Sequence, residues 1–287
     1  NTALGTNALD ANTTANNNTA VGFVALGANT TGAFNVAIGS AALDEVATAS
    51  NNVAIGYGSL SHASAGSSNA AVGSLALRDN QESFNSAVGA EALKVNTTGT
   101  RNAAFGAFAM DEHVTGNDNT ALGYGALSAS NGPADNTAVG SLALLSLTTG
   151  SANTAVGADT LQANTTGVQN VAVGSNSLDA NTTGTENTCV GYAALTETTT
   201  THRNTALIGS NAGNSGSPSG EITTGSNNVV LGDNNISNLF CADTSISSSD
   251  SRDKTDVESF NIGLAWIEAL RPVTYRWDRR TWYGTDT

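Results

Sequence analysis

The stretch 136–144 decides the fold. It reads Asn-Thr-Ala-Val-Gly-Ser-Leu-Ala-Leu, and its pattern returns along most of the chain. The motif Asn-x-Ala-(Val/Ile/Leu)-Gly begins twelve units, which are spaced by 17 residues with a single spacing of 16. The units start at Asn1, Asn18, Asn35, Asn52, Asn69, Asn85, Asn102, Asn119, Asn136, Asn153, Asn170 and Asn187. A fixed period of this size is typical of a solenoid, in which each unit buries its apolar side only by stacking on its neighbours. One unit is therefore expected to form one coil.

Four positions of the unit are nearly invariant when the Asn is counted as slot 1. Slot 3 is Ala except at Cys189, slot 4 is aliphatic except at Phe105, slot 5 is always Gly, and slot 9 is Leu except at Met110. Alternate residues of a strand point to opposite faces, so Thr-Ala-Val before the Gly predicts a short strand with two apolar faces. We expect a second strand around the Ala-Leu pair of slots 8 and 9, and we expect both faces to be covered.

Segments rich in turn-forming residues separate these apolar runs. Asn-Thr-Thr-Gly segments begin at Asn29, Asn96, Asn164 and Asn181, and Asn and Gly tolerate positive φ there. A helical repeat is the competing interpretation, but an invariant Gly beside a β-branched residue in most units would cost a helix about 1 kcal/mol per Gly. The region is therefore predicted to be all-β, as a parallel β-solenoid with coils of about 17 residues.

Bulky inward side chains are few for a coil of this length. The unit from Asn136 contributes Val139 and Leu144, with small residues such as Ala138 and Ala143. We expect the slot 4 residue and the slot 9 Leu to fill a narrow interior. The slot 3 Ala face is then free to approach other copies near a threefold axis, because alternate strand residues face opposite sides. The prediction is a homotrimer whose chains share one cross-section.

The Asn of slot 1 is expected to form a ladder of side-chain amides, each bonding to the copy above and below. Its role is structural. Cys189 occupies slot 3 and is interpreted as a small buried filler. Cys189 and Cys241 are predicted to be unpaired thiols, since two cysteines in 287 residues do not make a disulfide framework.

Composition excludes several classes of partner. The net charge of −14 argues against nucleic acid, because affinity for phosphates depends on Lys and Arg. No run of about 18 apolar residues is present, so no membrane insertion is expected. The three His lie in different units and the Asp residues follow no calcium pattern, so we predict neither a metal nor a cofactor. The chain lacks an initiator Met and begins in phase with its own repeat, which indicates a fragment.

The repeat resembles two kinds of known protein. The Asn-x-Ala-(Val/Ile)-Gly units look like the left-handed parallel β-roll of trimeric adhesin heads. The 17-residue version with Asn-Thr-Thr-Gly turns resembles the tail-fibre shafts of bacteriophages. The resemblance covers roughly residues 1–210 and implies a left-handed coil in a trimer.

The composition changes near the carboxyl end. From Cys241 onward lie six of the ten basic residues and all three Trp. We therefore predict three parts: a twelve-coil shaft over residues 1–203, a segment over 204–248 with a degenerate coil, the shaft terminus and a Ser-rich linker, and the start of a small α+β domain over 249–287.

The last part carries a recognisable order of motifs. Residues 249–254 read Ser-Asp-Ser-Arg-Asp-Lys. A helix is predicted between Asn261, which caps its start, and Pro272, which ends it, and residues 273–277 alternate like a strand. This order resembles the carboxy-terminal intramolecular chaperone of phage tailspikes and endosialidases, which begins with Ser-Asp-x-Arg-x-Lys and continues with a helix ending in Leu-Arg-Pro and a Tyr-x-Trp strand.

The resemblance implies a domain that trimerises, guides the folding of the shaft and removes itself by a cut beside the motif serine. Carried onto this chain, it implies Ser249 as the nucleophile and Lys254 as its base. Asp250 and Arg252 are then motif partners. A serine hydroxyl needs an adjacent base, and a Lys desolvated by assembly supplies one. Because the chain stops at Thr287, only the start of such a domain is expected here.

The leading hypothesis is structural: the tail-fibre shaft of a bacteriophage, placed in the virion and outside the cell. Its expected partners are two further copies of itself, tail proteins upstream, and a glycan or protein of the host cell surface. At most a single-turnover self-cleavage of the Ser/Lys type is expected. The alternative is the head of a bacterial trimeric adhesin on the cell surface, which needs a coiled-coil stalk and an anchor downstream. A glycan-cleaving activity is a third hypothesis, but no paired carboxylates recur in one coil.

Overall fold

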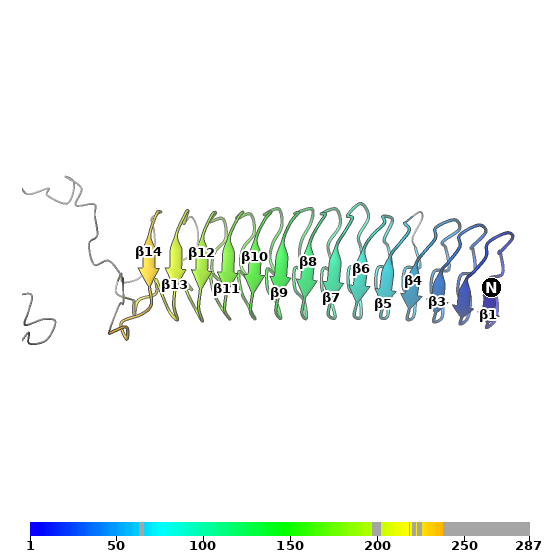
Figure 1. Cartoon of the computed structure of the whole chain (residues 1–287), viewed down its shortest axis with the longest axis horizontal. Helices are drawn as coiled ribbons and strands as arrows, with labels where there is room; N and C mark the ends of the chain where they lie inside the picture. Colours follow the sequence, from blue (N-terminus) through cyan, green and yellow to red (C-terminus); the bar gives the residue numbers. More distant parts are fainter. Residues whose placement is uncertain (63–65, 197–201, 218, 220–221, 223–225, 238–287) are drawn as a thin grey trace, which may run out of the picture. The chain divides into compact units, whose positions relative to one another are not determined.

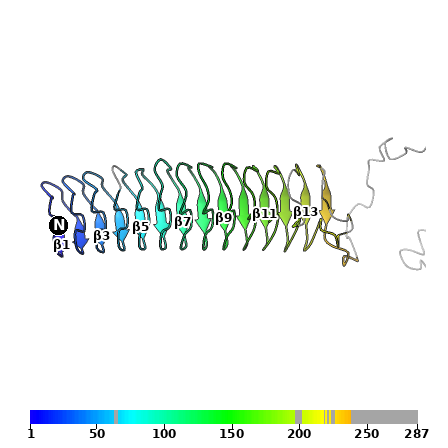
Figure 2. The ribbon, with the colours of Figure 1, turned by 180° about the vertical axis from the view of Figure 1, so that it is seen from behind.

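The computed structural model describes residues 1–62, 66–196, 202–217, 219, 222 and 226–237. They form one sheet of fourteen parallel strands, paired in sequence order. The strands are β1 (Thr2–Leu4), β2 (Thr19–Val21), β3 (Val36–Ile38), β4 (Val53–Ile55), β5 (Ala70–Val72), β6 (Ser86–Val88), β7 (Ala103–Phe105), β8 (Thr120–Leu122), β9 (Thr137–Val139), β10 (Thr154–Val156), β11 (Val171–Val173), β12 (Thr188–Val190), β13 (Ala206–Ile208) and β14 (Val229–Leu231). Figures 1 and 2 show them side by side in one row, each joined to the next by a returning loop. No helix occurs in the described ranges, and the predicted parallel β-solenoid is confirmed.

In the observed strand register, one sequence repeat forms one coil. Ala138 pairs with Ala155, and Ala155 with Ala172, so each slot lies directly over the same slot of the next coil. The shorter spacing after Asn69 leaves this register intact, because Ala70 pairs with Ser86. The sheet also continues beyond the twelve units through β13 and β14, whose coils are longer than the rest.

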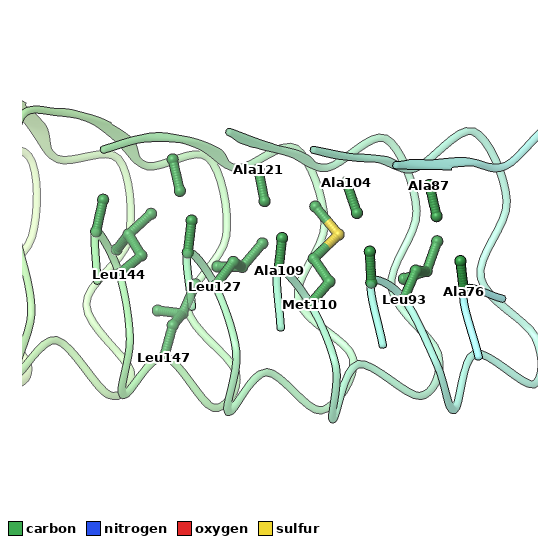
Figure 3. Packing of buried hydrophobic residues seen from close by; sticks show 14 of the residues in the cluster. Ala76, Ala87, Leu93, Ala104, Ala109, Met110, Ala121, Leu127, Leu144 and Leu147 are labelled. Carbon is green, nitrogen blue, oxygen red and sulfur yellow. The ribbon is translucent and has the colours of Figure 1, made fainter. Parts of the chain in front are cut away.

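The two faces of each strand are reversed relative to the prediction: slot 3 faces the interior, and slot 4 faces outward. The slot 3 side chains, such as Ala138, are fully buried, whereas the slot 4 side chains Ile38 and Leu122 are 40% and 50% exposed. The expectation that slot 4 fills the interior and slot 3 faces other copies is therefore wrong. Figure 3 shows Ala104 and Ala121 pointing from the strands into the coil, toward the slot 9 side chains.

The interior is closed by a single chain. The Ala rows of slots 3 and 8 and the Leu row of slot 9 belong to one continuous buried cluster. The narrow cross-section is filled by two rows of mostly Ala side chains, by one row of Leu or Met (Figure 3), and by the buried side chains of slots 1 and 12. The prediction that the chains share one cross-section is therefore wrong, and contacts between copies can form only through the outer surface.

The predicted second strand is also absent from the described coils. Slots 7 and 9 have positive φ, for example 57° at Leu142 and 52° at Leu144, and so the chain there forms turns instead of extending. These turns still bond to the next coil, since the Leu127 amide donates to the Ala143 carbonyl at 2.9 Å. A left-handed conformation costs a non-glycine residue about 1–2 kcal/mol. Burial of the Leu side chain, which contributes about 1.5–3 kcal/mol, offsets this strain.

The invariant Gly of slot 5 has a steric cause. Gly140 has φ of 138°, and a Cβ placed there would overlap the carbonyl oxygen of Gly157 in the next coil. Each slot 5 backbone therefore lies directly against the next one, and no larger residue fits between them.

The Asn-Thr-Thr-Gly turns are closed by side chains and not by positive φ. Asn164 donates from Nδ2 to the Gly167 carbonyl at 3.1 Å, and its Oδ1 accepts from the Gly167 amide at 3.1 Å. Asn181 then donates to Asn164 Oδ1 at 3.0 Å. The positive φ angles expected at these Asn and Gly residues fall instead on slots 7, 9 and 17. Slot 12 thus carries a second, discontinuous Asn ladder.

The slot 1 ladder is confirmed. The Asn136 backbone amide donates to Asn119 Oδ1 at 3.0 Å, and its own Oδ1 accepts from the Asn153 amide at 3.0 Å. Asn136 Nδ2 also donates to the Gly150 carbonyl at 3.1 Å across the coil. At Thr205 the Asn is missing, although the Thr205 amide still donates to Asn187 Oδ1 at 3.2 Å.

Replacement of one ladder residue tests how much the ladder stabilises the fold. Asn136→Ala leaves the Asn153 amide and the Gly150 carbonyl buried without their partners, and we expect a loss of at least about 2 kcal/mol in the free energy of unfolding. Denaturant unfolding followed by circular dichroism measures it. The control is Asn131→Ala, at an exposed Asn, which is expected to change stability by less than about 0.5 kcal/mol. Equal midpoints for the two variants would contradict a stabilising ladder.

Candidate functional sites

The motif predicted for self-cleavage lies outside the described residues. This applies to Ser249, Asp250, Arg252 and Lys254, and to the helix and strand predicted after them. Their assignment as nucleophile, motif partners and base stays a prediction. The candidate sites that the structure places are therefore on the solenoid.

The outward face of the sheet carries a continuous aliphatic row, which we call the slot 4 stripe. All of its side chains are exposed or half-buried, with Leu4 at 68% and Ile208 at 52% among the most exposed. The stripe consists of Leu4, Val21, Ile38, Ile55, Val72, Val88, Phe105, Leu122, Val139, Val156, Val173, Val190, Ile208 and Leu231. Because parallel strands lie about 4.8 Å apart and are in register, each of these side chains contacts the next.

The extent of the slot 4 stripe indicates an interaction surface. Monomeric soluble proteins rarely expose contiguous apolar patches larger than a few hundred Å². This stripe runs over all fourteen strands of the sheet. Slot 2 lies on the same face of each strand, and its side chains are mostly Thr, Val and Ala, which add no charge. The surface is therefore suited to burial against another apolar surface.

Two ion pairs between coils are formed by slot 17 residues, shortly before the strands. Arg101 donates from Nε and Nη2 to the two carboxylate oxygens of Asp118, both at 2.6 Å. The hydrogen bonds from Arg101 lower the pKa of Asp118. Arg203 makes the same kind of pair with Glu186 at 3.1 Å. Such exposed pairs are screened by water and stabilise only weakly, so they help to align neighbouring coils more than to hold them.

Cys189 is a filler, as predicted. Its side chain is fully buried in the slot 3 row and forms no disulfide. Burial raises the pKa of its thiol to about 12. The thiol therefore stays protonated at neutral pH, and it has no role as a nucleophile or metal ligand. Cys241 lies outside the described residues.

His113 takes the place of Asn in the slot 12 ladder. Its ring is fully buried. Nε2 donates to the Gly116 carbonyl at 3.0 Å, and Nδ1 lies 2.6 Å from the Ser130 hydroxyl oxygen. Desolvation by burial lowers the pKa of the ring. The neutral imidazole thus closes its turn as the Asn amides do in other coils.

This burial predicts a loss of stability in acid. The pKa of an unfolded His is about 6.5, and that of folded His113 is lower. Stability is therefore full above the unfolded pKa and falls as pH drops toward the folded pKa, by up to about 1.4 kcal/mol per pH unit. We expect His113→Asn to unfold like the wild type at pH 7.5 and to be the more stable protein at pH 5, as measured by thermal unfolding. The pKa of His202 is also lowered by burial. Because His202 is present in both proteins, its contribution to the pH dependence does not affect the difference between them. A constant difference across pH would contradict the prediction.

Two features are absent from the residues that the structure describes. No helix there is long and apolar enough to cross a membrane. In the same part of the chain, no three side chains among His, Cys, Asp and Glu gather in a way that could hold a metal ion.

Comparison with known proteins identifies the carboxyl end. Residues 249–286 match the family model described as chaperone of endosialidase, in agreement with the predicted resemblance. This match and the β-solenoid together fit a tail fibre with an endosialidase-type chaperone, and such a chaperone domain implies trimerisation. No curated protein and no solved structure matches the chain.

Proposed function

We propose that this chain is the structural shaft of a bacteriophage tail fibre, assembled from three copies that pack through the slot 4 stripe. The observation that carries the proposal is the combination of a closed interior with an uncovered aliphatic row. Because the slot 3 and slot 9 side chains already fill the coil, the stripe can only be buried from outside. Three parallel copies around one axis bring the same slots of all chains together.

The trimer supplies a rigid spacer between the tail and the host. Tail proteins upstream would hold one end, and a glycan or protein of the host cell surface would be the distal partner. The match of residues 249–286 favours this assignment over the head of a bacterial adhesin, which would continue into a stalk and anchor. The location that follows is the virion, outside the cell.

The same proposal assigns a maturation step to the carboxyl end. The Ser249 hydroxyl attacks a neighbouring peptide carbonyl and its proton passes to the Lys254 amine. The peptide bond beside Ser249 breaks as the Lys254 ammonium passes that proton to the leaving nitrogen, and water then hydrolyses the ester. Asp250 and Arg252 accompany them as motif partners. Cleavage releases the chaperone once the shaft has formed, so it makes assembly irreversible.

Two measurements test the function. Native mass spectrometry of the chain is expected to give three copies per particle, and a monomer or dimer contradicts the packing. Proteomics of purified phage particles made from a genome that carries the gene is expected to find peptides from residues 1–237 and none from 255–286. Absence of the shaft peptides from these particles contradicts the proposed location.

A further inference from the structure

A hollow of about 290 Å³ opens on the surface of three consecutive coils, in the turns that follow β7, β8 and β9. This volume is close to the lower end of the range for ligand pockets, about 300 Å³, so the ligand can be no larger than one small cyclic molecule. Its walls are formed by Phe108, Asp111, Tyr124, Gly125, Ser128, Leu142 and Leu145. These residues come from slots 6, 7 and 10, which vary from coil to coil.

The hollow exists because slot 7 of the middle coil has no side chain. Phe108 precedes Gly125 at this slot and Leu142 follows it. A Cβ built on Gly125 meets only Leu142 Cδ2, at 3.0 Å, and nothing else within 4 Å. The space that a side chain would take is therefore open to a ligand.

One wall of the hollow is aromatic. The rings of Phe108 and Tyr124 lie edge to face, with centroids 5.8 Å apart and an angle of 78° between their planes. Tyr124 is 58% exposed, which leaves ring surface free for contact. An aromatic face of this kind packs on the C–H face of a pyranose ring, and the phenol hydroxyl adds a donor and acceptor at its rim.

Two of the lining residues are polar. The Asp111 carboxylate accepts a hydrogen bond from the Ser128 hydroxyl of the next coil. A carboxylate has about four acceptor positions, so it can accept further bonds from sugar hydroxyls. A negative group here, on a chain with net charge −14, repels an acidic sugar such as a sialic acid.

We propose that this hollow binds one neutral hexose unit of a surface glycan, with Tyr124 stacked on the sugar ring and Asp111 accepting from its hydroxyls. The inference rests on the proposed attachment function and names the class of ligand. Since three copies carry the site, a shaft binds polymeric glycan through several weak contacts at once.

Saturation-transfer NMR on the full chain tests the site with four probes: the methyl glycosides of glucose, galactose and mannose, and the methyl glycoside of N-acetylneuraminic acid. At least one neutral glycoside is expected to receive saturation. Gly125→Asn, whose side chain fills the hollow, is expected to weaken its binding at least about tenfold. Asn occurs at the same slot in Asn7, Asn176 and Asn211 with positive φ, so the variant has a backbone conformation the fold already uses.

The matched control is Gly58→Asn, which is the same change at slot 7 of another coil, after Tyr57 but beside Ala41 in place of Phe. It is expected to bind as the wild type does. If Gly125→Asn fails to fold, Tyr124→Ala and its control Tyr57→Ala decide the question, because both side chains are exposed. Binding of the sialoside alone, equal binding by both variants, or no binding of any neutral glycoside overturns the proposal. The number of copies, measured by native mass, separates this failure from failure of the shaft assignment.

Discussion

Ser249→Ala is expected to leave the protein in one piece. When the complete gene is expressed, the wild type should separate on a denaturing gel into a shaft and a smaller chaperone fragment. Removing the nucleophilic hydroxyl should slow this cut by at least about 10³-fold, so the variant remains a single full-length band. Intact mass spectrometry of the shaft fragment then places the cut beside residue 249.

Two controls separate chemistry from folding. Ser251→Ala removes a neighbouring hydroxyl and should be cut normally. Lys254→Arg keeps the positive charge but cannot give up its proton, so it should remain uncut if Lys254 is the base. All variants should show the same number of copies by native mass. Normal cutting of Ser249→Ala would remove Ser249 from the proposed mechanism.

Charge on the slot 4 stripe is expected to abolish the trimer. The double variant Ile38→Asp/Ile55→Asp places two carboxylates on neighbouring strands of the outward face. In a trimer these become six negative charges buried around one axis, and burial of unpaired charge costs several kcal/mol per ion. Sedimentation velocity should then find single chains. Because both side chains point outward, the circular dichroism spectrum should still be that of a β-solenoid.

A matched control adds the same charge elsewhere. Thr31→Asp/Thr98→Asp changes two exposed residues of Asn-Thr-Thr-Gly turns, outside the slot 4 stripe. It should sediment as the wild type does. A stripe variant that stays trimeric would place the contact between copies on another surface, and the packing proposed here would then be abandoned.

The sequence predicts the coil and its strands well, because both depend on backbone properties that repeat. A fixed period places each Asn136-like residue over the next, and the invariant Gly and buried Asn leave few alternatives. The direction of the strand is harder to predict. Alternation says that Ala138 and Val139 face opposite sides, but both are apolar and either could be inside.

A signal for the correct direction was nevertheless present. A closed interior tolerates little change of volume. Within the twelve units, slot 3 varies only from Ala to Cys189, whereas slot 4 varies from Val to Phe105. The row with constant size is the enclosed one, and the row with variable size is outside. In a narrow coil, constant side-chain volume is thus a better indicator of the buried row than large side-chain size. Large size favours slot 4, which faces outward.

The candidate sites also differ in whether the sequence alone could predict them. The motif at Ser249 is a local pattern and could be recognised in the sequence. The hollow at Gly125 and the buried ring of His113 could not, because slots 7 and 12 vary and no periodic pattern distinguishes them. Much of their environment comes from residues in the adjacent coils, which lie one full unit away in the sequence.

The in-register stacking of near-identical coils allows the gene to gain or lose repeats by recombination. A crossover between two repeats of the gene, in phase with the unit, removes or adds whole coils. Each junction it creates still pairs slot with slot, so the Asn ladder, the Gly contacts and the outer aliphatic row all continue through it. The length of the solenoid can therefore change between generations without a new protein fold, while the turns stay free to acquire new surface chemistry.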